Sequence, residues 1–294
     1  MIRATSGRPG STVRRGVQQV AVDADGVARS ERRDVLATEE PFEIRVGVSG
    51  GASAAVPVAV TMRTPGADFD LAAGFLHSEG VISTGEQVRE IRYCVAERGG
   101  EQRYNTVTVL LAPGTPFDPA RLQRNFYTTS SCGVCGKASI EAVLELGCPP
   151  VEGCLQVRPE VLVTLPSKLR EAQTVFDRTG GLHAAGCFTA GGDLLRIRED
   201  VGRHNALDKV VGAALLAGEV PLGGRIVLVS GRLSFELVQK AARAGVALLA
   251  GVSAPSSLAA EFAQQARMTL VGFLRGSRFN VYTGAGRIAA AQAA

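Results

Sequence analysis

Residues 225–274 read RIVLVSGRLSFELVQKAARAGVALLAGVSAPSSLAAEFAQQARMTLVGFL, and this stretch decides the fold class. Short apolar segments in it alternate with segments of helical spacing, in the order 225–229, 234–243, 246–250, 256–267 and 270–274. Short apolar strands between helices are typical of a largely parallel sheet that helices cover on both faces. The stretch therefore predicts an α/β domain.

The alternation of strands and helices continues on both sides of this stretch. Upstream we expect helices at 137–146, 167–178 and 205–217 and a strand pair at 184–190 and 194–198; downstream we expect a last strand at 278–282. The first part of the chain is β-rich instead. It has alternating segments at 42–48, 54–63, 88–96 and 104–111, a helix at 67–79, and a proline-rich linker at 112–124.

These segments divide the chain into four parts. We predict a disordered or extended segment at 1–32, a smaller β-rich α+β domain at 33–124, an α/β domain at 125–284 and a flexible tail at 285–294.

Composition narrows the class of protein. The 294 residues carry a net charge of +4, contain no tryptophan and show no basic stripe with interleaved aromatics, so we expect no nucleic-acid partner. No apolar run approaches the ~18 residues that cross a bilayer, so we expect no membrane association. The arginine-bearing N-terminus lacks the apolar stretch of a secretion signal, and the expected location is the cytoplasm.

The segment SCGVCGK at 131–137 contains a Cys-x-x-Cys, formed by Cys132 and Cys135. The following lysine and the expected helix start both favour a thiolate, which is the reactive form of cysteine. Three chemistries remain open from the residues alone: dithiol redox, a zinc site, and carriage of a sulfur atom as a persulfide.

Zinc needs further ligands. His77 and Glu79 form an H-x-E, as in zinc nucleobase deaminases, but Ser131 stands where those enzymes have a proline before the first cysteine. We interpret His77 as a histidine at the end of a helix.

Glycine-bearing loops follow several expected strands. His183 ends TGGLH at 179–183, and the segment EDVGRHNALDK at 199–209 brings Arg203, His204 and Lys209 to a strand-to-helix junction. These three are suited to a phosphate, with Asp200 orienting His204. The alternative is an ordinary helix start with Asp200 or Asn205 as its N-cap.

Two further loops carry candidate ligand-binding residues. Ser230 and Arg232 follow the strand at 225–229, although the loop lacks the spacing of a P-loop. In the segment 273–279, Arg275 and Arg278 flank a Gly-Ser turn between two phenylalanines. Arginines match phosphates and an aromatic ring stacks on a flat base, so this segment suits a nucleotide-bearing ligand. The alternative is a β-turn with solvated arginines.

Several motifs together resemble the FdhD/NarQ family, whose members are accessory sulfurtransferases of formate dehydrogenase. They are SCGVCGK, RTGGLHAAG, EDVGRHNALDK, SGRLSFELVQKA, SAPSSLA and GFLRGSRFNVYT, and the resemblance runs from about Glu39 to Thr283. It implies a cytidine-deaminase-like layered C-terminal domain with a smaller N-terminal domain, and a homodimer.

The resemblance also implies a reaction. Cys132 would receive persulfide sulfur from a cysteine desulfurase, with Cys135 as its partner, and pass it to the bis-guanine-dinucleotide molybdenum cofactor for formate dehydrogenase. The family's cofactor-binding stretch matches Phe273, Leu274, Arg275, Gly276, Ser277 and Arg278; His183, Arg203, His204, Ser230 and Arg232 are further candidates. No permanently bound metal is expected. The alternatives are a cofactor-binding chaperone without sulfur chemistry and a zinc-dependent deaminase.

Overall fold

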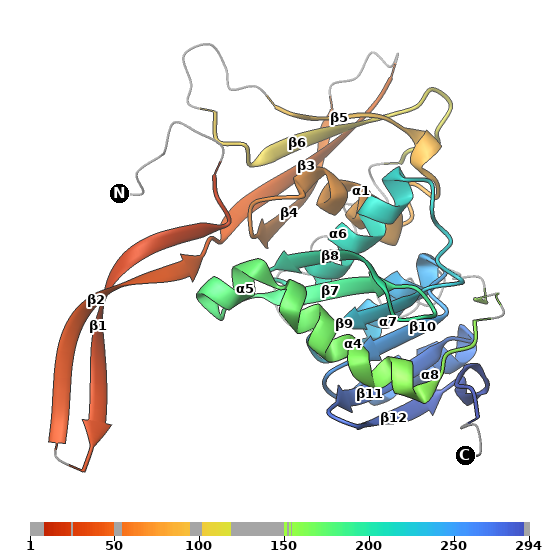
Figure 1. The fold of residues 1–294 in the computed structure, drawn as a ribbon. Helices are drawn as coiled ribbons and strands as arrows, with labels where there is room; N and C mark the ends of the chain where they lie inside the picture. The colour runs from red at the N-terminus through yellow and green to blue at the C-terminus, as the bar shows by residue number, and fades with distance from the viewer. Residues whose placement is uncertain are drawn as a thin grey trace.

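A six-stranded sheet forms the centre of the second half of the chain in this computed structural model, which describes residues 9–24, 26–49, 55–94, 102–118, 150–151, 153 and 155–290 (Figure 1). The strands are β7 (His183–Phe188), β8 (Leu194–Asp200), β9 (Ile226–Val229), β10 (Leu248–Gly251), β11 (Thr269–Arg275) and β12 (Arg278–Thr283). Their order is β12-β11-β10-β9-β7-β8. β9, β10 and β11 are parallel, and β7 and β12 run antiparallel to their neighbours.

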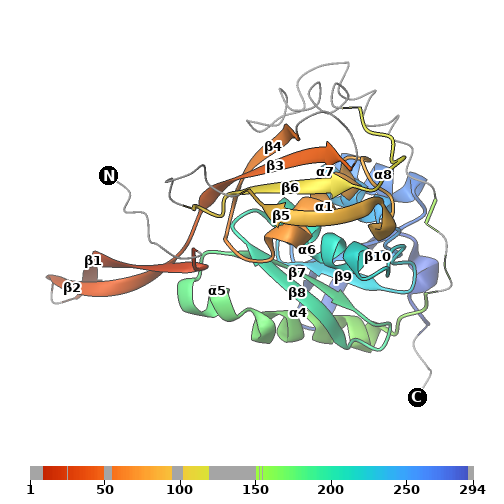
Figure 2. The same cartoon turned by 90° about the horizontal axis from the view of Figure 1, so that it is seen from above.

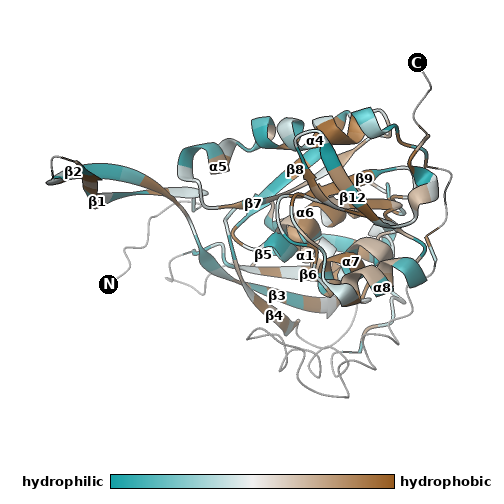
Figure 3. Cartoon of the chain, turned by 90° about the horizontal axis from the view of Figure 1, so that it is seen from below, coloured by the Kyte–Doolittle hydropathy of each residue, from teal (hydrophilic) through white to brown (hydrophobic). Residues whose placement is uncertain are grey.

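Helices cover both faces of this sheet, which confirms the predicted α/β class. On one side lie α6 (Arg203–Leu216), α7 (Phe235–Arg243) and α8 (Ser257–Gln265), and on the other lies α4 (Pro159–Ala172). The core between them is apolar, and β9 is hydrophobic along its length (Figure 3). No helix among the described residues is both long and apolar enough to cross a bilayer.

The helix predicted at 167–178 is wrong in its extent. α4 begins at Pro159, ends at Ala172 and is followed by the short α5 (Thr174–Thr179). Pro166 was expected to precede the helix but lies inside it, where it removes one backbone hydrogen bond. Leu162, Leu165 and Leu169 are buried against the sheet on the same side of α4, and this burial offsets the loss.

The first half of the chain forms a smaller unit, residues 40–111, here called the N-terminal unit. Its four-stranded sheet has the order β4-β3-β6-β5, built from β3 (Glu40–Val48), β4 (Val56–Arg63), β5 (Val88–Tyr93) and β6 (Thr106–Leu111). The helix α1 (Asp68–Ser78) packs on this sheet, and a short 3-10 turn (Gly85–Gln87) precedes β5.

The two units meet where α1 packs along α6 (Figure 2). Gly74 of α1 and Gly212 of α6 face each other so closely that a Cβ on Gly74 would overlap the carbonyl oxygen of Asp208, and one on Gly212 that of Asp70. Leu215 of α6 belongs to the core of the N-terminal unit. The contact therefore depends on backbone approaching backbone at two glycines.

The N-terminal segment forms two paired strands. β1 (Thr12–Asp23) and β2 (Gly26–Ala37) form an antiparallel hairpin, the β1–β2 arm, that projects from the body (Figure 1). The arm runs past residue 32, where the sequence placed the end of a disordered or extended segment. β1 is rich in valine, which favours a strand, but its valines at 13, 17, 20 and 22 do not keep the two-residue period that would indicate one.

The predicted tail at 285–294 is held in place over its first residues. A 3-10 turn (Ala285–Arg287) is followed by an isolated bridge between Val157 and Ile288, and the amide of Ala289 donates to the carbonyl of Val157 at 2.9 Å. Small residues with no periodic pattern gave no signal of this pairing.

Candidate functional site

Cys132 and Cys135 lie outside the described residues, as does the helix predicted at 137–146. The described part of the site is therefore the set of loops predicted from the strand ends.

Those loops gather at one edge of the six-stranded sheet, here called the carboxyl edge. The parallel strands β9, β10 and β11 end there, at Val229, Gly251 and Arg275. Because β7 and β12 run in the opposite direction, they begin at this edge, and His183 pairs with Asp200 at the end of β8. The topology therefore places every strand end concerned on the same side of the sheet.

His183 lines a cavity of about 390 Å³ at the β7 end of the edge. The other lining residues are Arg170, Gln173, Phe176, Gly180, Gly181, Leu182, Val201 and Ser230. Burial lowers the pKa of His183, and the nearby Arg203 guanidinium lowers it further. The imidazole is therefore neutral at pH 7.

The sequence did not single out Arg170, Gln173 and Phe176 as site residues. Arg170 belongs to α4 and Phe176 to α5, with Gln173 between the two helices, in a segment that the spacing identified only as one helix. The guanidinium of Arg170 lies 4.7 Å from the centre of the Phe176 ring and pairs with the Asp177 carboxylate at 3.0 Å, so its charge at this end of the edge is partly neutralised.

Arg203 and His204 begin α6, with Gly202 as the N-cap. Both Arg203 and His183 adjoin Gly231: an ideal Cβ there would lie 3.6 Å from the Arg203 Cδ and 3.5 Å from the His183 Nδ1. The Nε atom of Arg203 is buried and has no hydrogen-bond partner among the described residues. The two residues therefore border the same small space after β9.

The hypothesis that Asp200 orients His204 is wrong. The Nε2 atom of His204 lies 3.2 Å from the Ser234 hydroxyl and 3.2 Å from a Glu236 carboxylate oxygen. Burial, and then the Lys240 ammonium, lower the pKa of His204 to about 4.

Lys209 does not face a phosphate site, because it is 2% exposed and its Nζ pairs with Asp200 at 2.7 Å. Neither Asp200 nor Asn205 is the N-cap. The Asp200 carboxylate instead accepts a hydrogen bond from the Gly202 amide at 2.8 Å.

Ser230 and Arg232 lie in the loop after β9. The Ser230 hydroxyl accepts a hydrogen bond from the Ala184 amide at 2.9 Å, which holds the loop against the start of β7. Arg232 is exposed at the same loop.

The turn between β11 and β12 borders a second cavity, of about 310 Å³, lined by Phe273, Arg275, Arg278 and Asn280. Phe273 has a φ of 53°, a left-handed conformation that is unusual for an aromatic residue and stores strain. Its amide donates to the Ser253 carbonyl at 3.1 Å, and the Arg275 guanidinium lies 5.7 Å from the centre of its ring. Both arginines are exposed, so their charges are available to a ligand.

The other residues of the predicted stretch are placed differently. Leu274 is fully buried in the core of the six-stranded sheet, so its side chain does not reach the cavity. Gly276 and Ser277 form the turn itself.

The H-x-E lies away from this edge, at the end of α1. His77 is buried, with its Nδ1 atom 3.2 Å from the Ile82 carbonyl oxygen, and burial lowers its pKa. Among the described residues, which exclude both cysteines of the Cys-x-x-Cys, no three histidine, cysteine or acidic side chains are placed to hold a metal ion.

These features define an α/β protein of two units whose sheet edge presents arginines beside two cavities. Comparison with known proteins shows the family. The chain belongs to the FdhD/NarQ family, whose profile matches residues 37–289.

Curated relatives cover nearly the whole chain. It is 54% identical to the sulfur carrier protein FdhD of Streptomyces avermitilis over 270 residues, 91% of this chain and 93% of the relative. It is 51% identical to the protein of the same name from Mycobacterium tuberculosis over 262 residues, 87% and 92% of the two chains.

A solved structure has the same fold. The crystal structure of a candidate formate dehydrogenase accessory protein from Desulfotalea psychrophila is 25% identical, with a TM-score of 0.69. The match covers 94% of this chain and 99% of that one.

Proposed function

We propose that this chain is a sulfurtransferase that carries sulfur for the maturation of formate dehydrogenase. The observation that carries the proposal is the carboxyl edge itself. His183, Arg203, Arg275 and Arg278 gather there in a chain that is about half identical to sulfur carrier proteins.

Cys132 is the proposed sulfur carrier and Cys135 its partner. The Cys132 thiolate attacks the terminal sulfur of a persulfide on a cysteine desulfurase. A new S–S bond forms on Cys132 while the donor's S–S bond breaks, and the donor cysteine leaves as a thiolate. No oxidant is consumed, because the transferred sulfur keeps its oxidation state.

The proposed acceptor is the bis-guanine-dinucleotide molybdenum cofactor, which is the cargo of this protein and not its resident group. Arg275 and Arg278 suit a pyrophosphate, and Phe273 presents a ring on which guanine can stack. The two cavities lie toward opposite ends of the strand order, and an acceptor with two nucleotide ends matches two such cavities. The cytidine-deaminase-like layering, the homodimer and the cytoplasmic location belong to the same proposal.

The test is intact-mass analysis after incubation with a cysteine desulfurase and cysteine. We expect the wild-type chain to gain the mass of one sulfur atom and Cys132→Ala to gain none. Cys187→Ala is the matched control. Burial raises the pKa of the Cys187 thiol to about 11, so that cysteine stays protonated and unreactive.

Formate dehydrogenase activity in cells separates the proposal from its alternatives. Loss of activity with Cys132→Ala supports sulfur transfer. Activity retained in Cys132→Ala but lost in Arg275→Ala and Arg278→Ala would instead identify a cofactor chaperone without sulfur chemistry. Stoichiometric zinc in the purified protein would favour a deaminase.

A further inference from the structure

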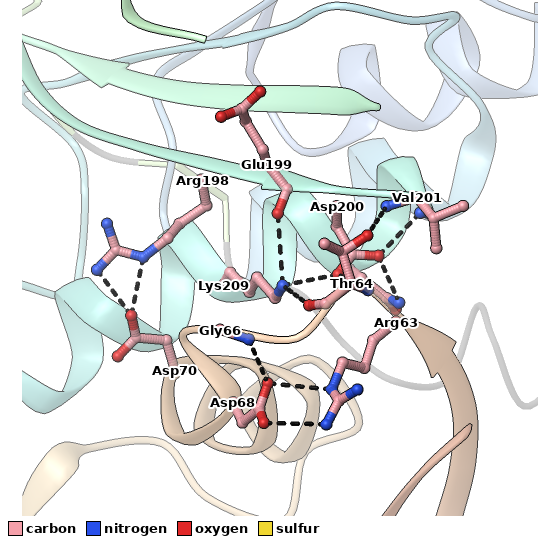
Figure 4. Close-up of polar contacts among 12 residues, drawn as sticks. Arg63, Thr64, Gly66, Asp68, Asp70, Arg198, Glu199, Asp200, Val201 and Lys209 are labelled. Atoms are coloured by element: carbon pink, nitrogen blue, oxygen red, sulfur yellow. Dashed lines mark hydrogen bonds and ion pairs between the residues drawn. The ribbon is translucent and has the colours of Figure 1, made fainter. Parts of the chain in front are cut away.

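Asp200 ends β8 at the carboxyl edge and is fully buried. One carboxylate oxygen pairs with the Lys209 ammonium at 2.7 Å and accepts from the Thr64 amide at 3.1 Å. The other accepts from the Gly202 amide at 2.8 Å and from the Asn205 side chain at 3.0 Å. Figure 4 shows this group, which joins the end of β8 to the loop that follows β4.

Residues close to Asp200 make further bonds between the start of α6 and the end of β4 with the loop that follows it. The Lys209 ammonium donates to the Thr64 carbonyl at 2.9 Å, and the Val201 amide donates to the Thr64 hydroxyl at 3.2 Å. The Asn205 side chain donates to the Met62 carbonyl at 2.7 Å. The loop from β8 to α6 is therefore connected along its length to the N-terminal unit.

That loop leads into Arg203, the first residue of α6. The Cδ atom of Arg203 lies beside Gly231, as does the His183 ring. The Nε atom of Arg203 is buried without a partner among the described residues. A buried donor without a partner in the described part of the chain is costly, and an anion that enters beside Arg203 at the carboxyl edge would satisfy it. The position of this donor depends on the loop, and the loop depends on Asp200, Lys209 and Thr64.

The burial of the Asp200 and Lys209 charges also indicates that this pair does more than hold the two units together. Moving a carboxylate and an ammonium out of water is costly, and apolar contacts between α1 and α6 already join the two units. A second ion pair between the units, Arg198 with Asp70 at 2.7 Å, is half-buried and forms no hydrogen bond with the described loop between β8 and α6. It is therefore a matched control for the Asp200–Lys209 pair.

We propose that Asp200, Lys209 and Thr64 are positioning residues through which the N-terminal unit fixes Arg203 for anion binding at the carboxyl edge. The inference rests on the proposed function, because it takes the acceptor's pyrophosphate as the anion. It assigns to the N-terminal unit a share in the affinity of a site that lies in the other unit.

The test measures binding of inorganic pyrophosphate to the purified full chain, at a temperature well below unfolding. Thr64→Val removes the acceptor for the Val201 amide while keeping the side-chain volume, and Thr64→Ser keeps the hydroxyl. We expect affinity to fall about fivefold in Thr64→Val and to be retained in Thr64→Ser. Asp200→Asn is expected to weaken binding about tenfold if it folds, and Asp70→Asn to leave binding unchanged.

Three outcomes would overturn the proposal. The first is wild-type affinity in folded Thr64→Val. The second is equal weakening in Asp70→Asn, which would show that any loss of contact between the units has the same effect. Arg203→Ala with wild-type affinity would also overturn it, since Arg203 would not be an anion ligand. Sulfur loading of Cys132 is measured separately, so failure here is distinguishable from failure of the proposed function.

Discussion

At the scale of single residues, the charge of the carboxyl edge comes from arginine. His183 and His204 lie near the Arg203 guanidinium, and His204 is also near the Lys240 ammonium. Burial and these cations lower the pKa of both imidazoles, so both are neutral at pH 7. An anion at this edge would therefore meet fixed arginine charges and neutral rings.

The stability of the protein is predicted to fall as the pH drops below about 6.5. His204 has a pKa of about 4 in the folded chain and about 6.5 in the unfolded one, so the unfolded state binds the extra proton in this window. The free energy of unfolding should decrease between pH 6.5 and 4 by up to about 3 kcal/mol. The Asp208 carboxylate acts in the opposite direction, because it favours the protonated ring.

Urea unfolding at pH 7.5 and pH 5 checks this prediction. His204→Gln keeps a polar partner for Ser234 but cannot titrate, so its stability should depend less on pH. An identical pH dependence in the variant and the wild type would contradict the assignment.

At the scale of elements, the contact between α1 and α6 determines how the two units sit together. Asp208 of α6 is buried there and accepts from the Ser78 hydroxyl of α1 at 2.7 Å and from the Lys240 ammonium of α7 at 2.8 Å. One carboxylate therefore joins three helices. The close approach of Gly74 and Gly212 brings this group within reach.

Gly212→Ala is predicted to destabilise the protein by about 3 kcal/mol, although alanine favours helix by about 1 kcal/mol. The added methyl would overlap the Asp70 carbonyl and force the helices apart. Ala213→Gly, at the neighbouring half-buried position, should cost only the propensity difference of about 1 kcal/mol. Denaturant unfolding measures both, and a Gly212→Ala variant as stable as wild type would refute the close contact.

At the scale of the whole molecule, the β1–β2 arm is separate from both hydrophobic cores. Its tip exposes Val20, Val22 and Val27, of which Val22 is 77% exposed. Near its base, the Arg178 guanidinium donates to the Thr12 hydroxyl at 3.2 Å. The arm thus adds little to the packing of the body.

A chain that starts at Thr38 is predicted to fold with an unfolding temperature within about 3 °C of the full chain, because none of the removed residues that the structure describes belongs to either core. Glu40, which pairs with the buried Arg63, is retained. Arg178→Ala in the full chain is the control for the bond between Arg178 and Thr12 at the base. A fall of about 10 °C or more on truncation would show that the arm supports the body.

Local pattern predicted much of the body and the strand-end loops that carry the candidate site residues. Apolar runs such as 226–229 and helical spacing such as 235–243 are visible in single segments, and parallel strand ends must share an edge. Prediction from the sequence pattern failed where contacts between distant elements override a local rule. Pro166 lies inside α4 because the leucines around it are buried. Lys209 points inward because its ammonium pairs with the buried carboxylate of Asp200.

The sequence by itself determined the α/β class, the loops that carry the candidate residues, and the Cys-x-x-Cys at 132 and 135. Only the tertiary structure decided that Asp200 bonds to Thr64, 136 residues away, instead of orienting His204. The physical reason is the distance along the chain over which each feature is determined. Periodicity reports which side of an element is buried, whereas the partner of a buried charge depends on how two distant elements pack, here α1 against α6.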